Sequence, residues 1–140
     1  MKTRTLLCVT LCCFALATAC GEMRRHGLPP DAQQTIETAI RDIDNGRYDK
    51  LYQEAADEWR KDATLEASNA TLRTLREKLG TVRSRNQQSA REEQTPTGHS
   101  LVVIYETHFE RGSAMETFTL LERQGHWYLA RYFVSSSQLK

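Results

Sequence analysis

The last third of the chain constrains the fold most, because residues 101–134 alternate between apolar and polar side chains in three consecutive runs. A period of two, built from β-branched and aromatic residues, is typical of β-strands. One face of the first run carries the side chains Leu101, Val103, Tyr105, Thr107 and Phe109. The connections are short, and each contains a glycine that can supply the positive φ of a hairpin loop. The segment therefore predicts an antiparallel meander with strands at about 101–109, 115–121 and 127–134.

An antiparallel sheet with one apolar face needs a cover, and the upstream sequence supplies three amphipathic segments. The first is expected to form a helix from about residue 31 to the Asn-Gly pair at 45–46. The second places aromatic and aliphatic side chains on one stripe over 48–59, which predicts one continuous helix. The third is expected to begin at Asp62 or Thr64 as N-cap and to end at Gly80.

Residues 82–91 are mostly polar and alternate weakly, which we interpret as an edge strand followed by a loop at 92–98. The whole pattern predicts the α+β class, with N-terminal helices packed on a curved four-stranded antiparallel sheet. A chain of 140 residues has room for one domain. The expected divisions are a signal peptide (1–19), a lipidated tether (20–29), a single α+β domain (30–135) and a tail (136–140).

The first 19 residues are typical of a signal peptide, because Lys2 and Arg4 precede an apolar stretch that is too short to span a bilayer. Residues 16–21 (LATACG) resemble the bacterial lipobox, in which the cysteine is diacylated and becomes the first residue of the mature protein. Ala17 stands where leucine is most common in that motif. We therefore expect lipidation of Cys20, with secretion and cleavage nearby as the alternative.

Cleavage before Cys20 has two consequences for the mature chain. The other three cysteines lie in the removed segment, so no intramolecular disulfide is expected. Two of the 19 basic residues are also removed, which leaves 17 against 18 acidic residues and gives no electrostatic footprint for nucleic acid. The basic residues at 24–26 are interpreted as part of a solvated tether, with contact to anionic headgroups as the alternative. By resemblance to sorting rules in two-membrane bacteria, Gly21 implies the periplasmic side of the outer membrane.

Helices followed by a four-stranded antiparallel sheet resemble the cystatin-like cone of nuclear-transport-factor-two-like and ketosteroid-isomerase-like domains. A closer resemblance is to a bacterial family catalogued as domain of unknown function four-zero-one-nine. Four segments carry it: LGTVRSR (79–85), VIYETHF (103–109), METF (115–118) and GHWYLARYF (125–133). Membership implies the fold and no activity, because the family has none assigned.

Chemistry inside such a cone depends on five candidate pocket residues, namely Arg85, Tyr105, Glu116, Phe118 and Tyr128. An isomerase would need a carboxylate with a raised pKa and a hydrogen-bond donor opposite it, and Glu116 is the candidate carboxylate. The alternative, which we favour, is a structural ion pair between Glu116 and Arg85 or Arg131, because a buried charge needs a partner.

Other chemistries find little support in the sequence. Glu106 and His108 share a strand face, but two ligands do not make a metal site, and His99 and His126 cannot be placed from sequence. The chain has no Gly-x-Ser-x-Gly, His-Glu-x-x-His or phosphate-binding glycine loop. No metal, cofactor or catalytic nucleophile is therefore expected.

The sequence favours a non-catalytic, lipid-anchored envelope protein that binds a protein partner or a small apolar ligand. The alternatives are a small lyase or isomerase that uses a buried carboxylate, and a structural homodimer. The homodimer is expected if the exposed face of the sheet is apolar.

Overall fold

The computed structural model describes residues 27–96 and 98–140. Cys20 and the expected signal peptide lie outside these ranges. Within them the elements are α1 (Pro30–Asp44), α2 (Tyr48–Glu54), α3 (Asp57–Asp62), α4 (Leu65–Leu79), β1 (Val82–Thr95), β2 (Gly98–Phe109), β3 (Gly112–Arg123), β4 (His126–Ser135) and the short 3₁₀ helix η1 (Ser137–Leu139). No helix of the described residues is long and apolar enough to cross a bilayer.

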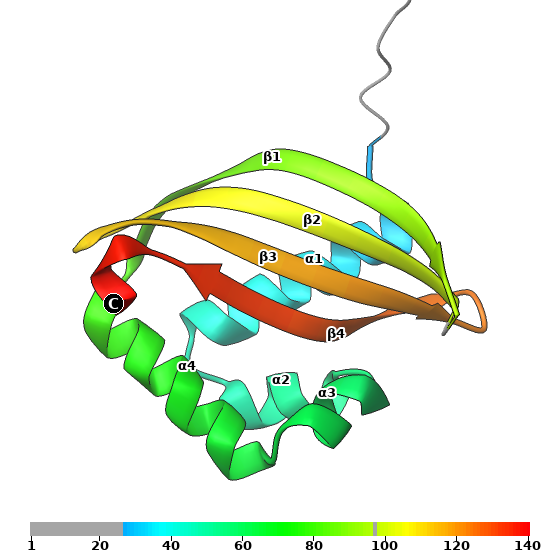
Figure 1. Cartoon of the computed structure of the whole chain (residues 1–140), viewed down its shortest axis with the longest axis horizontal. Helices are drawn as coiled ribbons and strands as arrows, with labels where there is room; N and C mark the ends of the chain where they lie inside the picture. Colours follow the sequence, from blue (N-terminus) through cyan, green and yellow to red (C-terminus); the bar gives the residue numbers. More distant parts are fainter. Residues whose placement is uncertain (1–26, 97) are drawn as a thin grey trace, which may run out of the picture.

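The four strands form one antiparallel sheet in the order β1-β2-β3-β4. The sheet is curved, and the helices lie together on its concave side (Figure 1). This arrangement confirms the predicted α+β class and the meander of strands. The convex side of the sheet has no helix over it in the described part of the chain (Figure 1).

The core lies between the concave face of the sheet and the helices. Ile36 of α1, Leu51 of α2 and Leu72 of α4 pack with the strand residues that point inward, among them Phe118 and Leu120. All five are at least 95% buried, so burial of apolar surface is the main force that holds the two layers together. The predicted inward face of β2 is confirmed, because Leu101, Val103 and Thr107 are also fully buried.

The predicted continuous helix over 48–59 is wrong, because the chain turns at Ala55 and Ala56 and forms two short helices. The backbone N–H of Ala56 leaves the helical pattern and donates to the carbonyl oxygen of Leu129 on the edge of β4, at 2.9 Å. Arg60 then donates to the carbonyl oxygens that end α2, those of Tyr52, Gln53 and Ala55. A contact with a strand far away in sequence therefore sets the break.

The edge strand is also longer than predicted. It was expected to end at residue 91 and to be followed by a loop at 92–98, but β1 continues to Thr95. Its last residues pair with the start of β2, from Glu92 opposite Leu101 to Thr95 opposite Gly98. Register shifts between Val82 and Ser84 and between Gln87 and Ser89 interrupt the period of two, which explains the weak alternation in the sequence.

The C-terminal segment, expected as a tail, folds back onto the domain. Leu139 of η1 packs on a small apolar cluster of Leu79, Ala114 and Val134. The hydroxyl of Ser136 donates to the carbonyl oxygen of Ser113 at 2.8 Å. Residues 136–139 therefore help to hold α4 beside the start of β3.

Candidate functional site

A buried ionic network crosses the core from β1 to β3. Glu116 of β3 is fully buried, and Arg85 of β1 donates to both of its oxygens, at 2.5 Å from Nε and 3.2 Å from Nη2. Arg85 also donates to both oxygens of Asp44 at the end of α1, at 3.1 and 3.2 Å. The hydroxyls of Thr107 and Tyr132 donate to Glu116 as well. One guanidinium thus bridges two carboxylates and ties edge strand, inner strand and helix together.

The network fills the hydrogen-bond acceptor sites of the Glu116 carboxylate. A carboxylate has about four lone-pair sites. Arg85, Thr107 and Tyr132 supply four donated hydrogen bonds between them. Burial raises the pKa of Tyr132 well above its usual value, and the negative charge of Glu116 adds to this, so the tyrosine stays a donor. Burial alone would lower the pKa of Arg85, but its hydrogen bonds to Glu116 and Asp44 outweigh burial and raise it. These contacts are those of a satisfied structural ion pair.

The structure brings four of the five predicted pocket residues together and places the fifth elsewhere. Tyr105 and Phe118 are in edge-to-face contact with ring centroids 5.7 Å apart, next to the pair of Arg85 and Glu116. Burial raises the pKa of Tyr105. Tyr128 lies near the start of β4, with 39% of its surface exposed. Phe118 is packed in the main core cluster.

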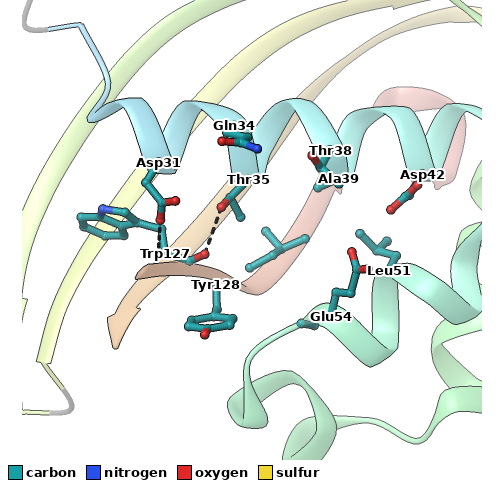
Figure 2. A pocket seen from close by; sticks show the side chains of 12 residues that line it. Asp31, Gln34, Thr35, Thr38, Ala39, Asp42, Leu51, Glu54, Trp127 and Tyr128 are labelled. Carbon is teal, nitrogen blue, oxygen red and sulfur yellow. Dashed lines mark hydrogen bonds between the residues drawn. The ribbon is translucent and has the colours of Figure 1, made fainter. Parts of the chain in front are cut away.

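Two clefts of the domain lie along β4. A polar cleft of about 240 Å³ opens where α1 and α2 meet the start of β4 (Figure 2). Asp31, Thr35 and Asp42 of α1 line it, with Glu54 of α2 and Tyr128 of β4. Asp31 accepts a hydrogen bond from the backbone N–H of Trp127 at 2.8 Å, and Thr35 donates to the carbonyl oxygen of the same residue at 3.0 Å.

The carboxylates of the polar cleft are engaged within the protein. Asp42 is almost fully buried and accepts hydrogen bonds from Arg47 and Lys50 at 2.7 and 2.8 Å. Burial would raise the pKa of Asp42, but these two cations lower it overall, so it stays ionised. Lys50 also bonds to Glu54 at 2.6 Å. The polar cleft is therefore the site where α1 is bonded to the edge strand β4, through Asp31 and Thr35, and where Asp42 is already paired.

A second cleft, the apolar cleft, opens farther along β4, between that strand and helices α3 and α4. Its volume is about 220 Å³. Most of its lining is aromatic or aliphatic: Trp59, Ala63, Ala67, Leu72, Leu75, Ala130 and the ring of Tyr132. Three polar residues, Ser68, Thr71 and Arg131, complete the wall together with Asp62. Cavities of about 150 Å³ with similar walls hold a molecule as large as benzene. The apolar cleft is therefore large enough for a small apolar ligand.

The break between α2 and α3 separates the two clefts. Ala55 lines the polar cleft, whereas Trp59 and Ala63 line the apolar one, and the bond from Ala56 to Leu129 lies between them. Of the five candidate pocket residues predicted inside the cone, Tyr128 alone lines one of these two clefts, the polar one. The sequence signal for the apolar cleft was Trp59, a tryptophan on the apolar face of its predicted helix. In the structure its indole N–H donates to the hydroxyl of Ser68 at 3.0 Å.

The three histidines of the described ranges, His99, His108 and His126, do not assemble a metal site. His99 lies between two carboxylates, with Nδ1 2.7 Å from Glu122 and Nε2 3.0 Å from Glu92, on opposite sides of the ring. Nδ1 of His126 lies 3.8 Å from Oδ1 of Asp31. The described ranges contain no group of three residues that could hold a metal ion.

Fold and clefts together define a small α+β domain with a buried structural ion pair and a ligand-sized apolar cleft between helices and sheet edge. The chain belongs to the family described as "Protein of unknown function (DUF4019)", whose model matches residues 35–132. The family resemblance inferred from the sequence is thereby confirmed. No curated protein matches the chain.

Two solved structures resemble the chain. Aln2 from a Streptomyces species is 11% identical with a TM-score of 0.50, over 78% of this chain and 90% of that one. RPA3114, a SEC-C motif containing protein from Rhodopseudomonas palustris, is 12% identical with a TM-score of 0.48, over 73% of this chain and 77% of that one. At so low an identity, the likeness to Aln2 is one of fold alone.

Proposed function

We propose that the protein is a non-catalytic binding module that takes a small apolar ligand in the apolar cleft. One observation carries the proposal: a cleft of about 220 Å³ with Trp59, Leu72 and Leu75 in its walls stands open between α4 and β4. Concave, mostly apolar sites with a few polar groups are the usual ligand sites of proteins. The sequence left a protein partner open as well, and a side chain of such a partner would use the same cleft.

The alternative of a lyase or isomerase finds less support in the geometry. Glu116 lines neither the polar nor the apolar cleft. Its oxygens already accept hydrogen bonds from Arg85, Thr107 and Tyr132, so no lone pair remains for a substrate proton. We therefore assign Glu116 to the structure of the domain.

A pair of matched variants tests the binding proposal. Ala67 is an exposed residue of α4 that lines the apolar cleft, and Ala70 is an exposed residue of the same helix that does not. Ala67→Trp is expected to fill the cleft and abolish the rise in melting temperature caused by a small aromatic ligand, because a ligand that binds only the folded state stabilises it. Ala70→Trp is expected to keep the rise. Equal rises in both variants would contradict the proposal.

The proposed location is the periplasmic side of the outer membrane, with the domain anchored through a lipidated Cys20. The lipobox-like residues 16–21 and the apolar stretch before them support this. Each buried methylene of an acyl chain contributes about 0.8 kcal/mol to membrane binding. Mass spectrometry of the protein purified from a bacterial membrane is expected to find fatty acyl mass on Cys20 and none in Cys20→Ser. Unmodified Cys20 at the new N-terminus would mean simple secretion.

We further infer a cystatin-like cone of the nuclear-transport-factor-two type for the domain. The order of helices before the meander and the curvature of the sheet support it (Figure 1).

The convex face of the sheet supports a second proposal, self-association. Phe133 is 60% exposed and Met115 39% exposed. Their strand positions are next to each other on this face, because Thr117 pairs with Phe133 and Met115 with Ser135. Exposed apolar patches are frequent at protein interfaces. A homodimer joined through this face is therefore expected.

A further inference from the structure

The polar groups of the apolar cleft indicate what kind of ligand it takes. Arg131 of β4 contributes to the cleft wall, and its side chain is 70% exposed. It forms one ion pair, from Nη2 to Asp62 at 3.2 Å, and that carboxylate is 62% exposed. A guanidinium has five N–H donors, so most donors of Arg131 have no protein acceptor among the described residues.

The interior of the cleft adds one more donor, the hydroxyl of Ser68. The hydroxyl oxygen of Ser68 accepts the indole N–H of Trp59, which leaves the hydroxyl proton of Ser68 to donate. The hydroxyl of Thr71 donates to the carbonyl oxygen of Ala67, and the hydroxyl of Tyr132 donates to the carboxylate of Glu116. Among the polar side chains of the cleft, Arg131 therefore keeps the most unused donors, while Asp62 at the mouth accepts one hydrogen bond from it and competes with a ligand carboxylate.

From this we infer that the ligand is a small apolar carboxylate, whose hydrocarbon body fills the cleft and whose carboxylate is bound by Arg131. The inference rests on the proposed binding function and specifies its ligand. Arg131 would then bridge two carboxylates, those of Asp62 and the ligand. The same chain already contains this arrangement in its core, where Arg85 bridges Asp44 and Glu116. Arginine suits such sites because its planar donors match carboxylate geometry.

Three probes with one body and different head groups test the inference: phenylpropionate, phenylpropanol and phenylpropylamine. Isothermal titration calorimetry near neutral pH is expected to rank phenylpropionate first, by about fivefold over phenylpropanol, since an exposed ion pair contributes up to about 1 kcal/mol. Phenylpropylamine is expected to bind weakest.

Three variants assign the preference to its residues. In Arg131→Gln the advantage of phenylpropionate over phenylpropanol is expected to disappear. In Asp62→Asn it is expected to grow, because the competing carboxylate is gone. Arg73→Gln, at an exposed position of α4 that does not line the apolar cleft, is the control and is expected to keep the wild-type ratio.

The possible failures are distinguishable. If phenylpropanol or phenylpropylamine binds the wild-type protein as tightly as phenylpropionate does, the carboxylate inference is wrong while the binding function stands. If the preference survives in Arg131→Gln, Arg131 is not the group that recognises the carboxylate. If none of the three probes binds, the proposed function itself fails, and the inference fails with it.

Discussion

At the scale of single residues, Glu116 is the fully buried carboxylate of the core, and it accepts four hydrogen bonds. Glu116→Gln keeps the shape of the side chain but removes the charge and turns an NH₂ group toward donors. Because Arg85 loses its buried partner, we expect the free energy of unfolding to fall by about 3 kcal/mol. Urea denaturation measures this loss.

Arg131→Gln is the matched control for that experiment, because it breaks an ion pair whose two side chains are both more than half exposed. The expected change is below about 1 kcal/mol. A Glu116→Gln protein as stable as the control variant would mean that the buried network does not stabilise the fold.

His99 gives the fold a dependence on pH. Its hydrogen bond to Glu122 raises the pKa of the imidazole; burial opposes the shift, and Glu92 adds to it. Because the folded pKa lies above the unfolded one, the stabilisation is fully present below the unfolded value of about 6.5 and is lost as pH rises through the folded value.

We therefore expect the difference in unfolding free energy between wild type and His99→Gln to be largest near pH 5.5 and to shrink toward about pH 8.5, a range chosen around the ordinary titration of histidine. Urea titrations at a series of pH values check this. A difference that stays constant over the series, or that grows with pH, would show that His99 is not held as a cation between the two carboxylates.

At the scale of elements, Arg60 supports the break between α2 and α3 in addition to the Ala56–Leu129 bond, because it donates to three carbonyl oxygens at the end of α2. Arg60→Ala leaves these acceptors to solvent, so we expect a loss of about 1 kcal/mol in stability and faster hydrogen exchange at the amide of Ala63, which closes α3. Arg73→Ala, at an exposed position of α4, is the control and is expected to change neither quantity. Unchanged exchange in Arg60→Ala would assign the break to the Ala56–Leu129 bond alone.

Local sequence signals predicted most elements but not this break. Capping and periodicity fix single helices, and α4 does begin at the N-cap Thr64 and end at Gly80 as predicted. The bond from Ala56 to Leu129 joins residues far apart in the chain, and no local pattern encodes it. The register shift between Val82 and Ser84 places Arg85 on the inner face out of step with simple alternation, which is why this segment shows only a weak period of two.

At the scale of the whole molecule, the clefts were beyond sequence reasoning for the same cause. An ion pair of Glu116 with Arg85 or Arg131 was predicted, because a buried charge needs a partner of opposite sign, and the structure forms it with Arg85. The walls of the apolar cleft, however, combine residues of α3, α4 and β4. The width of the cleft depends on the distance between α4 and β4, which no local sequence pattern encodes. The aromatic residues of the strands were predicted to line a pocket. One of them, Phe118, instead packs in the main core cluster.

Self-association through the convex face also belongs to this scale. Phe133→Ser combined with Met115→Ser is expected to convert a dimer into a monomer in size-exclusion chromatography with light scattering, because both side chains are exposed on that face. Tyr128→Ser, also exposed on β4 but beside the polar cleft, is the control and is expected to stay dimeric. A monomeric wild-type protein would rule the dimer out.

The most direct test of the account is to locate a bound ligand by nuclear magnetic resonance. With phenylpropionate added to the folded domain, we predict nuclear Overhauser contacts from its ring protons to the methyl groups of Leu72 and Leu75 and to the indole of Trp59, the residues that line the apolar cleft. Contacts to the residues around Tyr128 instead, or no contacts at a saturating concentration, would contradict a ligand site between α4 and β4.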